Sequence, residues 1–152
     1  MNRIREILLP KQILLEVKAA TREEAIKTVT DSLKGDNRII DWQRFVDTLA
    51  ECQRSGKINI GVGLTIPHNR TSSVTSMVMA FGRLAQPIRH GPASIRYVLV
   101  IGIPETMDAD YLRLVGVLMR AFRENELRTA LETAKTPEEV LSAFEQGETR
   151  VT

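Results

Sequence analysis

The segment GVGLTIPHNR, residues 61–70, places His68 directly after a glycine-rich turn, and the chain has only 2 histidines. The cations Arg54, Lys57 and Arg70 lie in the surrounding window, residues 54–70, which contains no acid. A neutral imidazole near cations, with no competing carboxylate, suits the acceptance of a dianionic phosphoryl group. The residues therefore favour phosphoryl chemistry at His68. The simpler alternative is a loop histidine bonded to the backbone.

Several other chemistries lack the residues that they need. The turn has neither a GK[ST] ending nor the G-x-G-x-x-G spacing, so it predicts no P-loop and no dinucleotide site. There is no G-x-S-x-G elbow for a serine nucleophile and no pair of acids near the turn. Cys52, His68 and His90 do not have the spacing of a zinc site. We expect no metal and no cofactor.

Size and charge narrow the class of protein. A chain of 152 residues and 17.1 kDa is typical of one domain, here residues 1–152. Its net charge of +2 comes from cations spread along the chain, which argues against nucleic acid as a partner. The apolar run at residues 98–103 is too short to cross a bilayer. With one cysteine and no signal sequence, the expected location is the cytoplasm.

The hydrophobic pattern alternates between strands and helices. Apolar runs predict strands at residues 13–17, 75–81 and 95–103. Periodicity and capping residues predict helices at residues 22–34, between Asp41 and Gly56, from Asp108 through Phe122, at residues 126–134, and from Thr136 onward. The stretch around His90, residues 87–92, reads as a turn. This order predicts a three-layer α/β/α sandwich with a mixed β-sheet.

The motifs that carry a family resemblance run along nearly the whole chain. They are the opening ILLPKQILLEVKAATREEAI, the G-x-G-x-x-x-P-H run of Gly61, Gly63, Pro67 and His68, the step at Pro87-Ile88, the strand ending in Ile103-Pro104, and the T-P-E-E helix start at Thr136. On these residues the chain resembles the fructose/mannitol-type enzyme IIA domain of the bacterial phosphotransferase system, including its nitrogen-related branch.

The resemblance implies both an activity and partners. His68 would accept phosphate from the histidine phosphocarrier protein, which is charged through enzyme I from phosphoenolpyruvate. The absence of a fused sugar-transport segment favours the nitrogen-related branch. In that branch the phosphorylation state would regulate a transporter, a kinase or another enzyme. The oligomeric state is left open.

Three positions depart from the family pattern. Cys52-Gln53 stands where the family typically has an Arg-Glu pair, Tyr111 stands where many members have a second histidine, and Asn59 replaces a glycine. Arg54 follows Cys52 by two residues, or roughly 200° around a helix, so it can replace the family arginine only if the helix has already ended.

The supporting residues expected for the phosphoryl group are Arg54, Gly61, Gly63 and Tyr111, around a shallow depression that also contains His68. Two alternatives stay open. One is a degenerate enzyme IIA-like module that binds a transporter or kinase without being phosphorylated, which the changes at Cys52 and Tyr111 favour. The other is an unrelated domain whose glycine turn holds an anion through backbone amides.

Overall fold

The computed structural model describes residues 4–54 and 61–152. Its helices are α1 (Ile4–Ile7), α2 (Arg22–Asp31), α3 (Trp42–Arg54), α4 (Asp108–Phe122), α5 (Asn125–Thr133) and α6 (Pro137–Val151). Its strands are β1 (Leu8–Val17), β2 (Leu64–Thr65), β3 (His68–Thr71), β4 (Val78–His90) and β5 (Ala93–Pro104). Among these helices none is long and apolar enough to cross a membrane.

The strands form one mixed sheet. Its order is β1-β4-β5-β2, and β3 also pairs with β5. Strands β4 and β5 are an antiparallel hairpin, whereas β1 runs parallel to β4, and β2 and β3 run parallel to β5. Strands β2 and β3 therefore lie one after the other along the same edge of β5.

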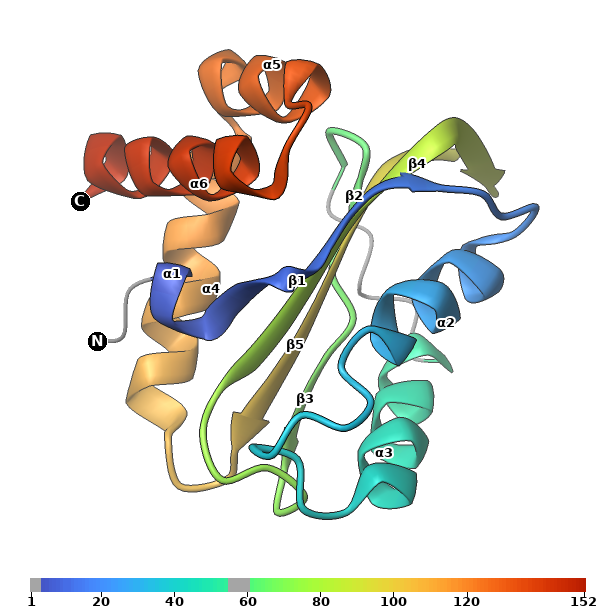
Figure 1. The fold of residues 1–152 in the computed structure, drawn as a ribbon, viewed down its shortest axis with the longest axis vertical. Coiled ribbons are helices and arrows are strands. Elements are labelled where there is room, and N and C mark those ends of the chain that lie inside the picture. Colours follow the sequence, from blue (N-terminus) through green and yellow to red (C-terminus); the bar gives the residue numbers. More distant parts are fainter. Residues whose placement is uncertain (1–3, 55–60) are drawn as a thin grey trace.

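Helices cover both faces of the sheet, with α2 and α3 on one side and α4, α5 and α6 on the other (Figure 1). Side chains of β5 alternate between the two cores. Leu99 and Ile101 join the core of α4, α5 and α6, and Val98 and Val100 join that of α2 and α3. The expected three-layer α/β/α sandwich with a mixed sheet is confirmed.

Capping residues start the helices where the sequence predicts. The Thr21 hydroxyl accepts a hydrogen bond from the Glu24 backbone N–H, and the Thr136 hydroxyl accepts one from Glu139. The Asp41 carboxylate caps α3 by accepting from the backbone N–H of Arg44. Helix α2 ends at Asp31, earlier than predicted, and Gly56 lies outside the described residues.

The stretch around His90 was wrongly predicted as a turn. Strand β4 continues to His90, which pairs with Ala93, and the turn is confined to Gly91 and Pro92. Pairing with β5 overrides the local turn signal, because the register shifts between Arg83 and Ile88 and so accommodates Pro87, which lacks a backbone donor.

The sequence also missed short elements. It did not predict α1, the early start of β1 at Leu8, or strands β2 and β3. Segments this short carry too few residues for a periodic pattern, and β2 and β3 exist because β5 supplies their hydrogen bonds. His68 accordingly lies in a strand and not at the mouth of the turn.

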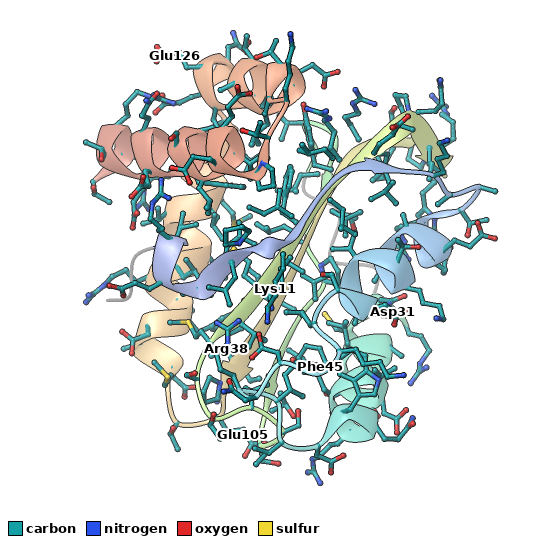
Figure 2. All side chains as sticks on the ribbon, viewed as in Figure 1. Lys11, Asp31, Arg38, Phe45, Glu105 and Glu126 are labelled. Carbon is teal, nitrogen blue, oxygen red and sulfur yellow. The ribbon has the colours of Figure 1, made fainter. Side chains whose placement is uncertain are left out.

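Gly102 of β5 lies directly under the Phe45 ring of α3. Phe45 extends from α3 toward the sheet (Figure 2), and a Cβ at Gly102 would lie 2.5 Å from its ring and 2.9 Å from Val78 Cγ2. All three residues are buried. Only a glycine fits here without displacing the Phe45 ring.

Gly102→Ala is therefore expected to lower the free energy of unfolding by about 1–3 kcal/mol through overpacking, measured by urea denaturation. Gly116→Ala is the matched control. Its Cβ would meet only the flexible end of Arg120 at 3.3 Å, and alanine favours the helix. Combining Gly102→Ala with Phe45→Leu should recover part of the loss. Equal stabilities of the two single variants would contradict the packing argument.

Candidate functional site

His68 is the first residue of β3 and lies beside the carboxyl-terminal part of β5. It pairs with Ile101 of β5, and the preceding Pro67 carbonyl accepts a hydrogen bond of 3.0 Å from the Ile101 backbone N–H. From the end of β5 the chain turns directly into α4 (Figure 1). The His68 side chain is half-buried, which leaves its ring accessible to another molecule.

A backbone contact fixes the tautomer of His68. The ring Nδ1 lies 2.7 Å from the carbonyl oxygen of Ile66. Since a carbonyl oxygen can only accept, Nδ1 carries the proton in the neutral ring and Nε2 keeps its lone pair. The ring is therefore oriented with Nε2 as its nucleophilic atom.

Tyr111 of α4 backs the imidazole. The two rings are stacked with their centroids 5.7 Å apart and their planes at 30°. Burial raises the pKa of Tyr111, the Cys52 thiol raises it further, and the positive charge of Arg70 opposes both. Cys52 of α3 and Arg70 of β3 thus both act on the half-buried Tyr111 of α4, whose ring stacks on His68.

Arg70 is the cation that the structure places in this group. Its guanidinium Nη2 lies 2.5 Å from the Asp108 carboxylate in the first turn of α4. Both side chains are substantially exposed, at 48% and 62%. The ion pair connects the strand that carries His68 to the helix that carries Tyr111.

Arg54 has a different position. Helix α3 continues through Arg54, so its side chain projects roughly 200° around the axis from that of Cys52. Arg54 is exposed, and no hydrogen bond or ion pair joins it to a described residue of the site. The condition under which it would replace the family arginine, an earlier end of the helix, is not met.

Gly61 and Gly63 have an indirect relation to His68. Both have φ of +78°, a backbone conformation that favours glycine. The Gly63 carbonyl accepts from the backbone N–H groups of Arg96 and Tyr97, which starts β2. This anchor lies about five residues from Ile101 along β5, or roughly 16 Å. The Gly63 carbonyl therefore fixes the start of β2 on β5, and among the described residues no hydrogen bond joins Gly61 or Gly63 to His68.

Asn69 was not singled out from the sequence, yet it anchors the site. Its side chain points to the opposite face of β3 and donates hydrogen bonds to the Phe45 carbonyl at 3.1 Å and to the Thr48 hydroxyl at 2.8 Å. It is 7% exposed. Only the alternation of side chains along β3 could have indicated this role, and β3 was not predicted.

His90 lies at the far end of the sheet. It is the last residue of β4, where the hairpin turns, whereas His68 pairs near the carboxyl end of β5. In the part of the chain that the structure describes, no three of His, Cys, Asp and Glu gather closely enough to hold a metal ion. Asn59 and Lys57 lie outside the described residues.

The fold is shared with solved IIA proteins. The structure of nitrogen regulatory protein IIA-Ntr from Neisseria meningitidis superposes with a TM-score of 0.83, at 21% identity, over 91% of this chain and 97% of that chain. The α/β/α sandwich of this chain is thus the fold of a solved IIA protein. The chain belongs to the EIIA 2 family of the phosphoenolpyruvate-dependent sugar phosphotransferase system, whose model matches residues 6–147.

Relatives by sequence include both sugar and nitrogen proteins. Over 138 residues, 88% of this chain, it is 27% identical to the 2-O-alpha-mannosyl-D-glycerate-specific EIIABC component of Escherichia coli (strain K12), of which it spans only 21%. It is 24% identical over 143 residues to the nitrogen regulatory protein of Pseudomonas aeruginosa, covering 91% of this chain and 92% of that protein. The resemblance found in the sequence is confirmed, and a phosphocarrier or regulatory role is supported.

Proposed function

We propose that residues 1–152 act as one enzyme IIA-like unit in the cytoplasm, accepting a phosphoryl group on His68 from the histidine phosphocarrier protein. The observation that carries this proposal is the hydrogen bond from Nδ1 to the Ile66 carbonyl, which leaves Nε2 unprotonated on a half-buried ring. The phosphorylation state then selects the regulated partner, a transporter, a kinase or another enzyme.

The transfer step conserves protons. The Nε2 lone pair of His68 forms a bond to phosphorus while the bond from phosphorus to the donor's ring nitrogen breaks and returns its electron pair to that nitrogen. The Nδ1 proton stays on His68, bonded to the Ile66 carbonyl. The protein contributes position and charge neutralisation, which are the main sources of catalysis in phosphoryl transfer.

The remaining site residues support the acceptor in this proposal. Tyr111 holds the imidazole plane through stacking. Gly61 and Gly63 guide the edge strands along β5 and so place His68 at its register position. Arg54, which the sequence predicts as a supporting residue, has no role in this proposal, because α3 directs its side chain away from the side of Cys52.

The direct test is incubation with phosphoenolpyruvate, enzyme I and the histidine phosphocarrier, followed by intact-mass measurement. One added phosphoryl group, labile in acid and stable in base, is the expected result for a phosphohistidine. An unmodified chain under conditions that phosphorylate a known IIA protein would instead support the binding module that acts without phosphorylation. The presence of Cys52 and Tyr111 at the two altered family positions is the observation that favours this second candidate.

Cys52→Arg should accelerate phosphorylation of His68 by about tenfold, or roughly 1.4 kcal/mol of transition-state stabilisation. Cys52 is close enough to Tyr111 to affect its pKa, so an arginine there would add a guanidinium beside the imidazole. The measurement is the initial rate of phosphate transfer in a rapid-quench assay.

Arg54→Ala is the comparator for this prediction. Because α3 directs Arg54 away from the side of Cys52, its removal should change the rate by less than about twofold. A tenfold loss in Arg54→Ala, with no gain in Cys52→Arg, would show that Arg54 has taken over the family role.

A further inference from the structure

The alternation of side chains along β3 places Arg70 on the same face as His68. Asn69, between them, points to α3, where it bonds the Phe45 carbonyl. His68 stacks on Tyr111 of α4, and Arg70 reaches Asp108 of the same helix. Two residues of strand separate the His68 and Arg70 Cα atoms by only about 6.6 Å.

The positive charge of Arg70 acts on Tyr111, the neighbour of the imidazole on this face. Arg70 is close enough to the Tyr111 hydroxyl to oppose the rise in its pKa, and Tyr111 lies against the His68 ring. Arg54 is not among the groups that shift the pKa of Tyr111. Its side chain also projects from a different side of α3 than that of Cys52. Of the described cations, Arg70 is the one that shares the strand face of His68 and also acts on the Tyr111 hydroxyl, whose ring stacks on the imidazole.

The ion pair with Asp108 uses only part of the hydrogen-bonding capacity of the Arg70 guanidinium. One nitrogen, Nη2, contacts Asp108, and a guanidinium presents five N–H donors in a planar fork. An exposed ion pair is weak and exchanges readily, whereas a phosphoryl group carries close to two charges and three acceptor oxygens. A phosphoryl group on Nε2 therefore competes effectively with Asp108 for Arg70.

We propose that Arg70 binds the phosphoryl group carried by His68 and that Asp108 holds the Arg70 guanidinium in place while the histidine is unphosphorylated. This inference rests on the proposed function, since it concerns the same acceptor. Phosphorylation then exchanges one partner of Arg70 for another and releases the Asp108 carboxylate at the start of α4. The phosphorylated and unphosphorylated states therefore differ in surface charge next to the exposed Leu112, where a partner protein can distinguish them.

The test loads His68 with phosphoramidate, a small-molecule donor that needs no phosphocarrier, and follows the phosphoryl group by ³¹P NMR as a function of pH. A bound guanidinium favours the dianion of the phosphoryl group. Arg70→Gln should therefore lower the acid dissociation constant of the phosphoryl group by about tenfold. Arg70→Lys keeps the positive charge but loses the planar fork of donors, so its phosphoryl group should have an acid dissociation constant between those of wild type and Arg70→Gln. Arg54→Gln and the exposed hairpin substitution Arg89→Gln should stay within about twofold of wild type.

Asp108→Asn separates a positioning role from a structural one. Without the Asp108 carboxylate, Arg70 should bind the phosphoryl group more tightly and raise the acid dissociation constant of that group. Most of this increase should be absent from the Arg70→Gln/Asp108→Asn double variant. A merely structural ion pair would make both single variants less stable in urea and leave the phosphoryl titration unchanged, which would overturn the proposal.

The outcomes also distinguish the two levels of inference. If phosphoramidate reveals the Arg70 effect but the phosphocarrier does not phosphorylate wild type, the proposed donor is wrong and the role of Arg70 holds. If wild type accepts phosphate from the phosphocarrier and Arg70→Gln titrates like Arg89→Gln, the role of Arg70 is wrong and the proposed function holds. If neither phosphoramidate nor the phosphocarrier places phosphate on His68, both the proposed function and the role of Arg70 are overturned.

Discussion

His68→Ala is expected to lose the whole of the acid-labile phosphate that wild type acquires from phosphoenolpyruvate, enzyme I and the histidine phosphocarrier. The reason is that Nε2 of His68 is the oriented lone pair, fixed by the bond from Nδ1 to the Ile66 carbonyl. Because the side chain is half-buried at the start of an edge strand, alanine should leave the fold intact. Intact-mass measurement reports the loss, and circular dichroism reports the fold.

His90→Ala is the matched control, since it removes the other histidine, at the far end of the β4–β5 hairpin. This variant should acquire phosphate at the wild-type level. Phosphate that persists in His68→Ala and disappears in His90→Ala would reject the assignment of the acceptor. Phosphate that persists in both single variants would place the modification on another type of side chain.

Arg38→Met is expected to lower the free energy of unfolding at pH 7 by about 3–5 kcal/mol, because it leaves a buried carboxylate without its cation. Arg38 forms a two-pronged contact with Asp36, at 2.9 and 2.7 Å. It also donates to the carbonyls of Ile7 and Met77, just before β1 and β4, and Gln12 donates to Asp36 at 2.6 Å. Arg38, labelled in Figure 2, thus joins the segment after α2 to the starts of two strands.

The pH dependence of stability tests the same network. Hydrogen bonds from Arg38 hold the pKa of Asp36 well below its ordinary value, even though burial opposes them. A depressed folded pKa stabilises the protein above the unfolded pKa of about 3.9, and this contribution is lost as pH falls through the folded pKa. In Arg38→Met the buried carboxylate instead prefers a proton, so the gap between wild type and variant should narrow on going from pH 7 to pH 4.

Arg5→Met is the control for a lost ion pair at the surface. Arg5 contacts Glu138 and Glu145 at 2.9 and 2.6 Å, but its side chain is 37% exposed. Its loss should cost less than about 1 kcal/mol in urea denaturation. If Arg38→Met costs no more than Arg5→Met, the buried network stabilises the fold no more than an exposed ion pair does.

Local signals in the sequence predicted the helices well. Thr21, Asp41 and Thr136 each bond a backbone N–H in the first turn of their helix, as their residue types indicate. The apolar run at residues 95–103 predicted nearly all of β5, whereas the run at residues 75–81 predicted only the first part of β4, residues 78–81. These features are local because a cap or a periodic face depends on residues within a few positions.

Features that depend on distant pairs were missed. Strands β2 and β3 form only because β5 offers its edge, and Pro87 lies within a strand because the β4–β5 register shifts there. The Asp36–Arg38 pair looks like an ordinary pair of surface charges in sequence, yet Asp36 is 7% exposed. Burial by remote segments cannot be inferred from the neighbours of a residue along the chain.

For the candidate site, the family and the candidate acceptor could be predicted from the amino-acid sequence, because the P-H pair after the glycines is a compact motif at His68. The surroundings of that histidine could not, because they depend on how the chain folds. In the folded chain Tyr111 stacks on the His68 ring, and Arg54 projects from a different side of α3 than Cys52. Arg70 contacts Asp108 because β3 is paired with β5. The physical reason is that the charge and orientation around an imidazole are set by strand register and helix phase, which the packing of distant segments fixes.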